Sequence, residues 1–148
     1  MTPILTDALW AVLHHLAAFA LVAVLFAEWS LTSRPLDPSR LQLLGRLDSS
    51  YGALAALVLT LGGARLVWGA KGLGFYTDNP VFWFKLGCFA LIGLLSIVPT
   101  VRILKWRRAA ALPGHDTVLQ TRRWMGAQLL LLPVLLLLAT LMARGVGH

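Results

Sequence analysis

Apolar residues dominate four long stretches of the chain, and short polar segments separate these stretches. The apolar stretches run from about 8 to 31, 47 to 68, 80 to 104 and 124 to 143. Each is close to the ~20 residues that a helix needs to cross the hydrocarbon core of a membrane. Lipid satisfies no open backbone group, and the strands of a membrane barrel are only about half as long, so all four stretches are predicted to be helices.

The pattern therefore predicts an all-α fold, with residues 1–148 forming a single domain that is an integral membrane four-helix bundle. The connecting segments, such as GAKGLGFYTDN and RRAAALPGHDT, are rich in turn-forming residues. Asp48 stands at the start of the second stretch, and we interpret it as a helix N-cap rather than an acid catalyst. The first stretch is too long for a signal-peptide core and has no basic start, so it is expected to remain as a span.

Composition supports a membrane protein and argues against a nucleic-acid partner. Of the 148 residues, 58% are hydrophobic and only 13% are charged, whereas soluble proteins average about 25% charged residues. The net charge of +7 could indicate nucleic acid, but the basic residues lie in short segments beside the apolar stretches. Membrane topology explains that placement, so no nucleic-acid binding is expected.

Basic residues are distributed unequally between the two sides of the predicted bundle. One side holds nine of them: Arg34, Arg40, Arg46, Arg102, Lys105, Arg107, Arg108, Arg122 and Arg123. The other side holds Arg65, Lys71 and Arg144, with Lys85 embedded in the third stretch. Cytoplasmic loops carry the excess of Lys and Arg, so we expect the first side in the cytoplasm and both termini outside it.

Three of the predicted helices carry embedded polar side chains at a similar depth. His14 and His15 lie ~10 Å from the outer end of the first helix, at 1.5 Å per residue. On the same measure, Lys85 lies ~8 Å from the outer end of the third helix and Arg65 ~5 Å from that of the second. Charged side chains inside a bilayer are costly and usually have a partner or a function, so we expect these groups to converge on one pocket. Snorkelling of both cations to the headgroups is the alternative.

Neighbouring residues on a helix point ~100° apart, so the two imidazoles cannot face the same site equally. His14 shares its face with small and mildly polar residues, whereas His15 shares its face with bulky aromatic ones. We therefore predict that His14 faces the interior of the bundle. Glu28, near the other end of the first helix, is expected to pair with a loop arginine, and a proton relay is the alternative.

An imidazole together with two cationic side chains suits a haem or a porphyrin. A neutral imidazole ligates iron, and cations bind the carboxylates that such a ring carries. His14 and His15 are therefore candidate metal ligands, and Arg65 and Lys85 are further candidate cofactor-binding residues. A bis-histidine haem needs imidazoles from two helices, however, and only the first predicted helix has any.

The segments LHHLAAFALVAVLFAEW, LDSSYGALAALVLTLGGARLVWGAKG and NPVFWFKLG…SIVPTVR resemble a bacterial family of four-span membrane proteins, the DUF2214 type of domain of unknown function. The resemblance extends over nearly the whole chain. It implies the same four-span architecture and a place in the bacterial inner membrane, but it implies no activity.

The layout is more distantly similar to the HemJ-type protoporphyrinogen IX oxidase. That family has a histidine early in its first span and a W-x-K-L motif opening its third, which LHH and WFKL match here through His14 or His15 and Lys85. The segment GRLDSSYG supplies Arg46 for a further motif. The resemblance implies a membrane oxidoreductase with His14 and Lys85 as the catalytic pair and haem b as the cofactor. Glu28 stands in the region where that family often has a second histidine.

Two other functions remain open at this stage. The first is a non-catalytic accessory or assembly subunit, in which the embedded cations bind lipid phosphates or a partner helix. The second is a small transporter that uses Glu28 and the cations as a relay, although four spans are few for that unless the chain forms a homo-oligomer. The expected partners are the lipid bilayer and a haem or porphyrin, and a homo-oligomer is left open.

Overall fold

The computed structural model describes residues 3–69, 72–109 and 111–147, and helices make up most of these parts. The helices are α1 (Pro3–Leu31), α2 (Pro38–Trp68), α3 (Leu73–Thr77), α4 (Pro80–Ala109) and α5 (His115–Ala143). No strand occurs among the described residues. All of the helices except α3 are long and apolar enough to cross a membrane. The predicted all-α bundle of four long apolar helices is therefore confirmed.

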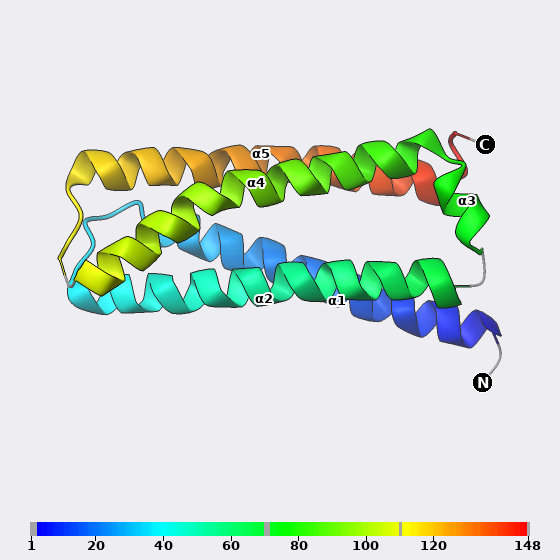
Figure 1. Ribbon diagram of the computed structural model, residues 1–148, viewed down its shortest axis with the longest axis horizontal. Helices are drawn as coiled ribbons and strands as arrows, with labels where there is room; N and C mark the ends of the chain where they lie inside the picture. The colour runs from blue at the N-terminus through cyan, green and yellow to red at the C-terminus, as the bar shows by residue number, and fades with distance from the viewer. Residues whose placement is uncertain (1–2, 70–71, 110, 148) are drawn as a thin grey trace.

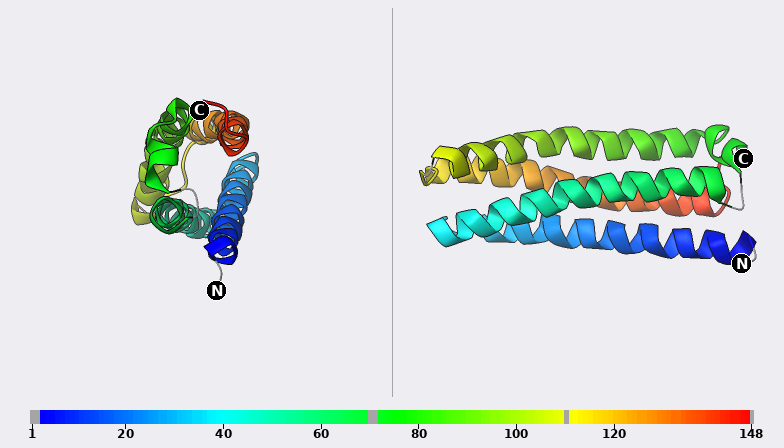
Figure 2. Two further views of the ribbon diagram at one scale, coloured as in Figure 1. Left: turned by 90° about the vertical axis from the view of Figure 1, so that its right-hand side faces the viewer. Right: turned by 60° about the horizontal axis from the view of Figure 1, so that its bottom comes forward.

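The long helices form two hairpins, α1 with α2 and α4 with α5, as Figures 1 and 2 show. The described chain begins and ends at the same end of the molecule as α3 (Figure 1), and we call this end the terminal end. We call the opposite end the basic end, where α1 connects to α2 and α4 connects to α5. In Figure 1 the hairpins meet at the basic end, on the left, and draw apart towards the terminal end. The two ends therefore differ in how closely the hairpins approach each other.

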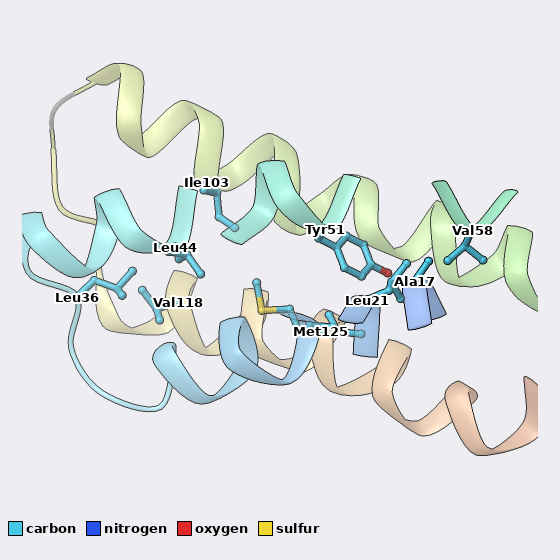
Figure 3. Packing of buried hydrophobic residues seen from close by; sticks show 10 residues of the cluster. Ala17, Leu21, Leu36, Leu44, Tyr51, Val58, Ile103, Val118 and Met125 are labelled. Atoms are coloured by element: carbon cyan, nitrogen blue, oxygen red, sulfur yellow. The ribbon is translucent and has the colours of Figure 1, made fainter. Parts of the chain in front are cut away.

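The larger apolar core lies in the half of the bundle where the hairpins meet. Leu25 of α1, Leu44 of α2, Ile103 of α4 and Met125 of α5 are each at most 1% exposed. Figure 3 shows Leu44, Ile103 and Met125 extending from three different helices into one apolar cluster. A separate small cluster of Tyr76, Phe82 and Met142 packs at the terminal end. Burial of apolar surface thus holds the hairpins together mainly towards the basic end.

Large apolar side chains cover the outside of the bundle. Phe19, Phe84 and Leu130 are 66%, 69% and 78% exposed, respectively. Exposed apolar surface on this scale marks contact with a partner or with a membrane in place of water. Together with the four long apolar helices, it indicates contact with the lipid bilayer.

The starts of α2 and α5 differ from the sequence-based expectation. Helix α2 begins at Pro38 rather than near residue 47, and α5 begins at His115 rather than near residue 124. The N-cap of α2 is Asp37, whose Oδ1 accepts a hydrogen bond from the backbone N–H of Arg40 at 2.8 Å. The interpretation of Asp48 as the cap is therefore wrong. The apolar stretch marks only the most apolar part of the helix, whereas the polar first turns extend beyond it.

Helix α4 starts in a similar way to α2, with a side-chain cap followed by a proline. The Asn79 side-chain oxygen accepts a hydrogen bond from the backbone N–H of Val81 at 2.8 Å. Its amide nitrogen donates to the carbonyl of Val146 at 3.0 Å, which ties the start of α4 to the end of the described chain. Pro80 suits the first turn because its fixed φ is already helical and it has no N–H to satisfy. Lys85 follows this capped start in the second turn of α4.

The segment between α2 and α4, expected to be a turn, contains the short helix α3. Lys71, which entered the count of basic residues, lies outside the described residues. The nine basic residues of the other group lie towards the basic end, Arg34 in the connector between α1 and α2 and the others in the parts of α2, α4 and α5 nearest to that end.

Candidate functional site

The His14 imidazole lies between α1 and α2 in the terminal half of the bundle. A Cβ atom at Gly62 of α2 would come within 3.3 Å of its Cε1, so a glycine there leaves room for the ring. The carbonyl of Val58 lies beside the ring and is suited to accept a hydrogen bond from it. The Nδ1 atom is buried and has no hydrogen-bond partner among the described residues. The prediction that His14 faces the interior is confirmed.

The His15 imidazole points away from the interior. Its side chain is exposed, and its Nδ1 bonds to the carbonyl oxygen of Ala11, one turn back in the same helix. The two imidazole rings meet edge-on, with centroids 6.0 Å apart. The structure therefore brings only one imidazole of this pair into the bundle.

The embedded cations approach His14 from two other helices. Lys85 of α4 and Arg65 of α2 are both half-buried, and the charges of both act on the His14 ring. The Lys85 Nζ lies 5.9 Å from the ring centroid of Phe82, one turn nearer the start of α4. The Nε of Arg65 is buried without a partner among the described residues. Side chains from α1, α2 and α4 thus contribute to one electrostatic environment in the terminal half.

Two residues of this region were missed by the sequence analysis. Asp7 of α1 places Oδ1 against Gly69, and this oxygen is buried without a partner among the described residues. Tyr76 of α3 is buried, and burial raises the pKa of its hydroxyl. The positive charge of Arg65 lowers this pKa, whereas the carboxylate of Asp7 raises it further. Asp7 precedes His14 by seven residues, a spacing that places both on one helix face and could have revealed it. The five-residue helix α3 has no such signal.

Three buried polar atoms therefore lack partners at this end of the described structure: Asp7 Oδ1, His14 Nδ1 and Arg65 Nε. Buried polar groups are nearly always hydrogen-bonded, and an exception calls for an explanation such as water or a ligand. Within the described residues, no cluster of three or more His, Cys, Asp or Glu could hold a bare metal ion. The arrangement suits a ligand that brings most of its own metal donors or that is itself an anion.

The polar groups in the half towards the basic end are arranged differently. The Tyr51 hydroxyl donates to the side-chain oxygen of Gln128 at 3.0 Å, across α2 and α5. The Thr100 hydroxyl donates to Asp48 Oδ1 at 2.6 Å, across α4 and α2. These hydrogen bonds link the two hairpins, and they give Asp48 a structural partner deep within α2.

Glu28 forms no ion pair with an arginine of the described residues. It is 2% exposed, and its Oε1 has no hydrogen-bond partner among them. Arg40 instead pairs with Asp37 at 3.5 Å, and Arg122 donates to the carbonyl of Trp29 at 2.7 Å. The expected pairing of Glu28 with a loop arginine is therefore wrong, because nearby arginines bind other groups closer to the surface.

Arg46, which the distant resemblance singled out, is not part of the site around His14. It is exposed at the basic end, where it lines a pocket of about 400 Å³ together with Arg107, Leu41 and Leu112. The structure thus groups His14, Arg65 and Lys85 and leaves His15 and Arg46 apart from them.

Comparison with curated proteins finds no match to this chain, and comparison with solved structures finds none either. One family model, described as "Predicted membrane protein (DUF2214)", matches residues 6–147. The match extends from the first turns of α1 to the end of the described chain, and so includes every residue of the site. The similarity to HemJ-type oxidases stays a prediction. The chain belongs to the DUF2214 family of predicted membrane proteins.

Proposed function

We propose that this integral membrane protein binds a haem or a porphyrin in the terminal half of its bundle. The observation that carries the proposal is the buried, unpartnered Nδ1 of His14, set among the charges of Arg65 and Lys85. An imidazole nitrogen without a partner is a potential metal ligand, and the two cations are potential partners for the ring carboxylates. The distant resemblance to HemJ-type oxidases implies two of these residues, His14 and Lys85, but not Arg65.

The surroundings of the His14 ring suit a histidine that would hold a haem iron. A metal-bound histidine usually donates its second ring N–H to a carbonyl or a carboxylate, which orients the ring. The Val58 carbonyl beside the ring offers such an acceptor, and the ring nitrogen that does not bond to it would be the one to hold the metal. Because His15 is turned outwards, His14 is the imidazole of this pair that would hold the metal.

Arg65 and Lys85 would hold the carboxylates of the bound ring. Both are half-buried, and neither forms an ion pair within the described residues. Charge-assisted hydrogen bonds in a region that excludes water are stronger than those at a surface. Asp7 and Arg65 both act on Tyr76 with opposite charge, so the Asp7 carboxylate would offset part of the attraction from Arg65, and Lys85 is expected to contribute more.

When bound, haem supplies one-electron redox chemistry, and the residues of this chain bind and orient it. We place the basic end in the cytoplasm, since its nine basic residues follow the positive-inside rule. The site then lies in the extracytoplasmic half of a bacterial inner membrane. His14 and Lys85 remain the proposed catalytic pair if the protein is an oxidoreductase.

The test is an absorption spectrum of the protein purified in detergent after haem supplementation, in the oxidised and the dithionite-reduced states. We expect a Soret band that the His14→Ala variant loses or shifts. The matched control is His15→Ala, which removes an adjacent imidazole that lies on the outside of the helix and should leave the spectrum unchanged. Wild-type protein without a Soret band would overturn the haem proposal.

Metal-free protoporphyrin separates ring binding from metal ligation. We expect the bound porphyrin to fluoresce equally in wild type and His14→Ala, whereas Lys85→Met and Arg65→Met should weaken its binding. If neither ring binds and Lys85→Met instead changes the oligomeric state or the retained lipid, the protein is better described as a non-catalytic accessory subunit. That result would replace the present proposal.

A further inference from the structure

Glu28 is the most deeply buried carboxylate of the described structure. Its side chain is 2% exposed, and Oε1 has no hydrogen-bond partner among the described residues. It lies one turn before the end of α1, in the half of the bundle where the hairpins meet and where the larger apolar core is packed. A carboxylate in such a position has lost its water without gaining a cation in return.

The groups that face Glu28 do not neutralise a negative charge. From α2, Asp48 acts on it as a second carboxylate, and Tyr51 lies close enough for the charge of Glu28 to act on its hydroxyl. The Tyr51 hydroxyl already donates its hydrogen bond to Gln128 of α5, and the Thr100 hydroxyl of α4 donates to Asp48. Neither hydroxyl donates to Glu28.

Arginines of α4 and α5 in the same half of the bundle also interact with groups other than Glu28. The charge of Arg107 of α4 acts on Asp48. Arg102 of α4 donates to Thr121 at 3.2 Å, and Arg122 of α5 stacks on the Trp29 ring, 3.8 Å from its centroid, while it donates to the carbonyl of that residue. The charge that acts on Glu28 is the negative charge of Asp48.

Elementary electrostatics decides which form of Glu28 is compatible with this setting. An ionised carboxyl group loses its hydration on burial and regains that energy only from an opposite charge or from several hydrogen-bond donors. Here the hydroxyls of Tyr51 and Thr100 already donate to other groups, and the charge of Asp48, which acts on Glu28, has the same sign. We propose that Glu28 is a proton-binding site of this protein, buried beneath a pocket that opens at the basic end.

A proton would reach Glu28 from water by way of that pocket. It has a volume of about 330 Å³, and its lining includes Thr32, Arg34, His115 and Arg122. The Thr32 hydroxyl donates to the backbone carbonyl of Glu28 at 3.1 Å, so the wall of the pocket lies one helical turn from the carboxyl-bearing residue. This site is separate from the His14 region, and the proposal needs no haem.

Infrared spectroscopy can isolate this one group, because Glu28 is the only glutamate in the chain. We propose to measure the carboxylic-acid C=O band of the full-length protein in lipid nanodiscs at neutral pH, with and without ¹³C-labelled glutamate. We expect a band that shifts with the label and that moves again in D₂O, because the pocket brings water close. No label-sensitive acid band at neutral pH means that Glu28 is ionised, and overturns the proposal.

Two variants provide the controls. Glu28→Gln should abolish the label-sensitive band, whereas Asp37→Asn, which removes a carboxylate at the surface, should leave it unchanged. Because the labelled wild-type protein already gives the decisive measurement, the test survives if Glu28→Gln fails to fold. Retention of the band in a folded Glu28→Gln variant would assign it to another group and overturn the proposal.

The role of Asp48 and the identity of the bound cation can be tested in the same samples. Asp48→Asn removes the neighbouring negative charge, so Glu28 should release its proton at a lower pH than in wild type. An unchanged or higher release pH contradicts the electrostatic coupling on which the proposal rests. Replacing choline chloride with sodium chloride should leave the band intact. Loss of the band in sodium would instead indicate a metal-ion site and overturn the assignment to a proton.

Discussion

The two halves of the bundle use their polar residues differently. Towards the basic end, polar side chains bind across the hairpins, as Tyr51 does with Gln128 and Thr100 does with Asp48. Towards the terminal end, Nδ1 of His14 and Nε of Arg65 are buried and have no partner among the described residues. The first half satisfies its polar groups internally, with Glu28 as an exception, whereas the second half leaves several of them free.

This difference separates groups that stabilise the fold from groups available to a ligand. A hydrogen bond between two helices in lipid adds stability because no water is present there to bond with the donor or the acceptor. An unpartnered buried group lowers stability, and it is retained more easily where a ligand compensates it. The half towards the basic end therefore contributes stability that can compensate for the unpartnered groups of the candidate site in the other half.

The largest expected effect tests whether the core near the basic end holds the hairpins together. Leu44→Ala should lower the free energy of unfolding by about 2–5 kcal/mol, because it leaves a cavity beside Ile103 and Met125. The matched control is Leu43→Ala, since the adjacent side chain is 47% exposed and faces outwards. Unfolding in mixed detergent micelles with increasing dodecyl sulfate measures both. Equal losses for the two variants would contradict the assigned position of the core.

A smaller effect is expected from the tyrosines of the two halves. Tyr51→Phe should lower the free energy of unfolding by about 1 kcal/mol, because the Gln128 oxygen loses its donor. Tyr76→Phe should cost less, since no hydrogen bond from the Tyr76 hydroxyl occurs within the described residues. The same unfolding assay compares the two. A larger cost for Tyr76→Phe would show that the terminal end also depends on an internal polar contact.

The smallest effect concerns the cap of α2 at the basic end. The hydroxyl of Ser39 and the backbone N–H of Arg40 donate to Asp37, and these hydrogen bonds lower the pKa of its carboxyl group. The stabilisation from this cap is therefore fully present above the ordinary aspartate pKa of about 4 and is lost as the pH falls through the lowered value. Asp37→Ala should be less stable than wild type at neutral pH, and the two should converge in acid.

Asp37→Ser is the control for this prediction. It keeps a capping oxygen that does not titrate in acid, so its stability should not follow the same pH dependence. Thermal unfolding in detergent across the acid range checks all three proteins. A constant difference between wild type and Asp37→Ala at every pH would show that the ionised carboxylate does not contribute to the cap.

The long apolar stretches were sufficient to predict the number and type of the main helices. The helix ends were harder to predict where polar residues continue a helix past its apolar part. Asp48 lies at such a boundary, and it was read as a cap although Asp37 and Pro38 form the actual start of α2. Both candidates have a capping side chain, so residue type alone could not distinguish them.

The candidate site was predicted in part. The depth of His14, Arg65 and Lys85 along their helices follows from counting residues, and His14 was correctly assigned to the interior from its neighbours on the helix face. Asp7 and Tyr76 were missed, because one lies in the first turns of α1 and the other in a short helix without an apolar pattern. Gly62 was missed as well, since the room that it leaves for His14 depends on how α1 packs against α2.

The sequence by itself determined that the chain forms four apolar helices with basic residues gathered at one end, because helix length and charge are properties of each segment alone. Only the tertiary structure decided that Glu28 lies near Asp48 rather than beside an arginine, and that the hairpins draw apart where His14 is found. Those outcomes depend on the crossing of helices and on the direction of side chains, which arise from packing between segments distant in the sequence.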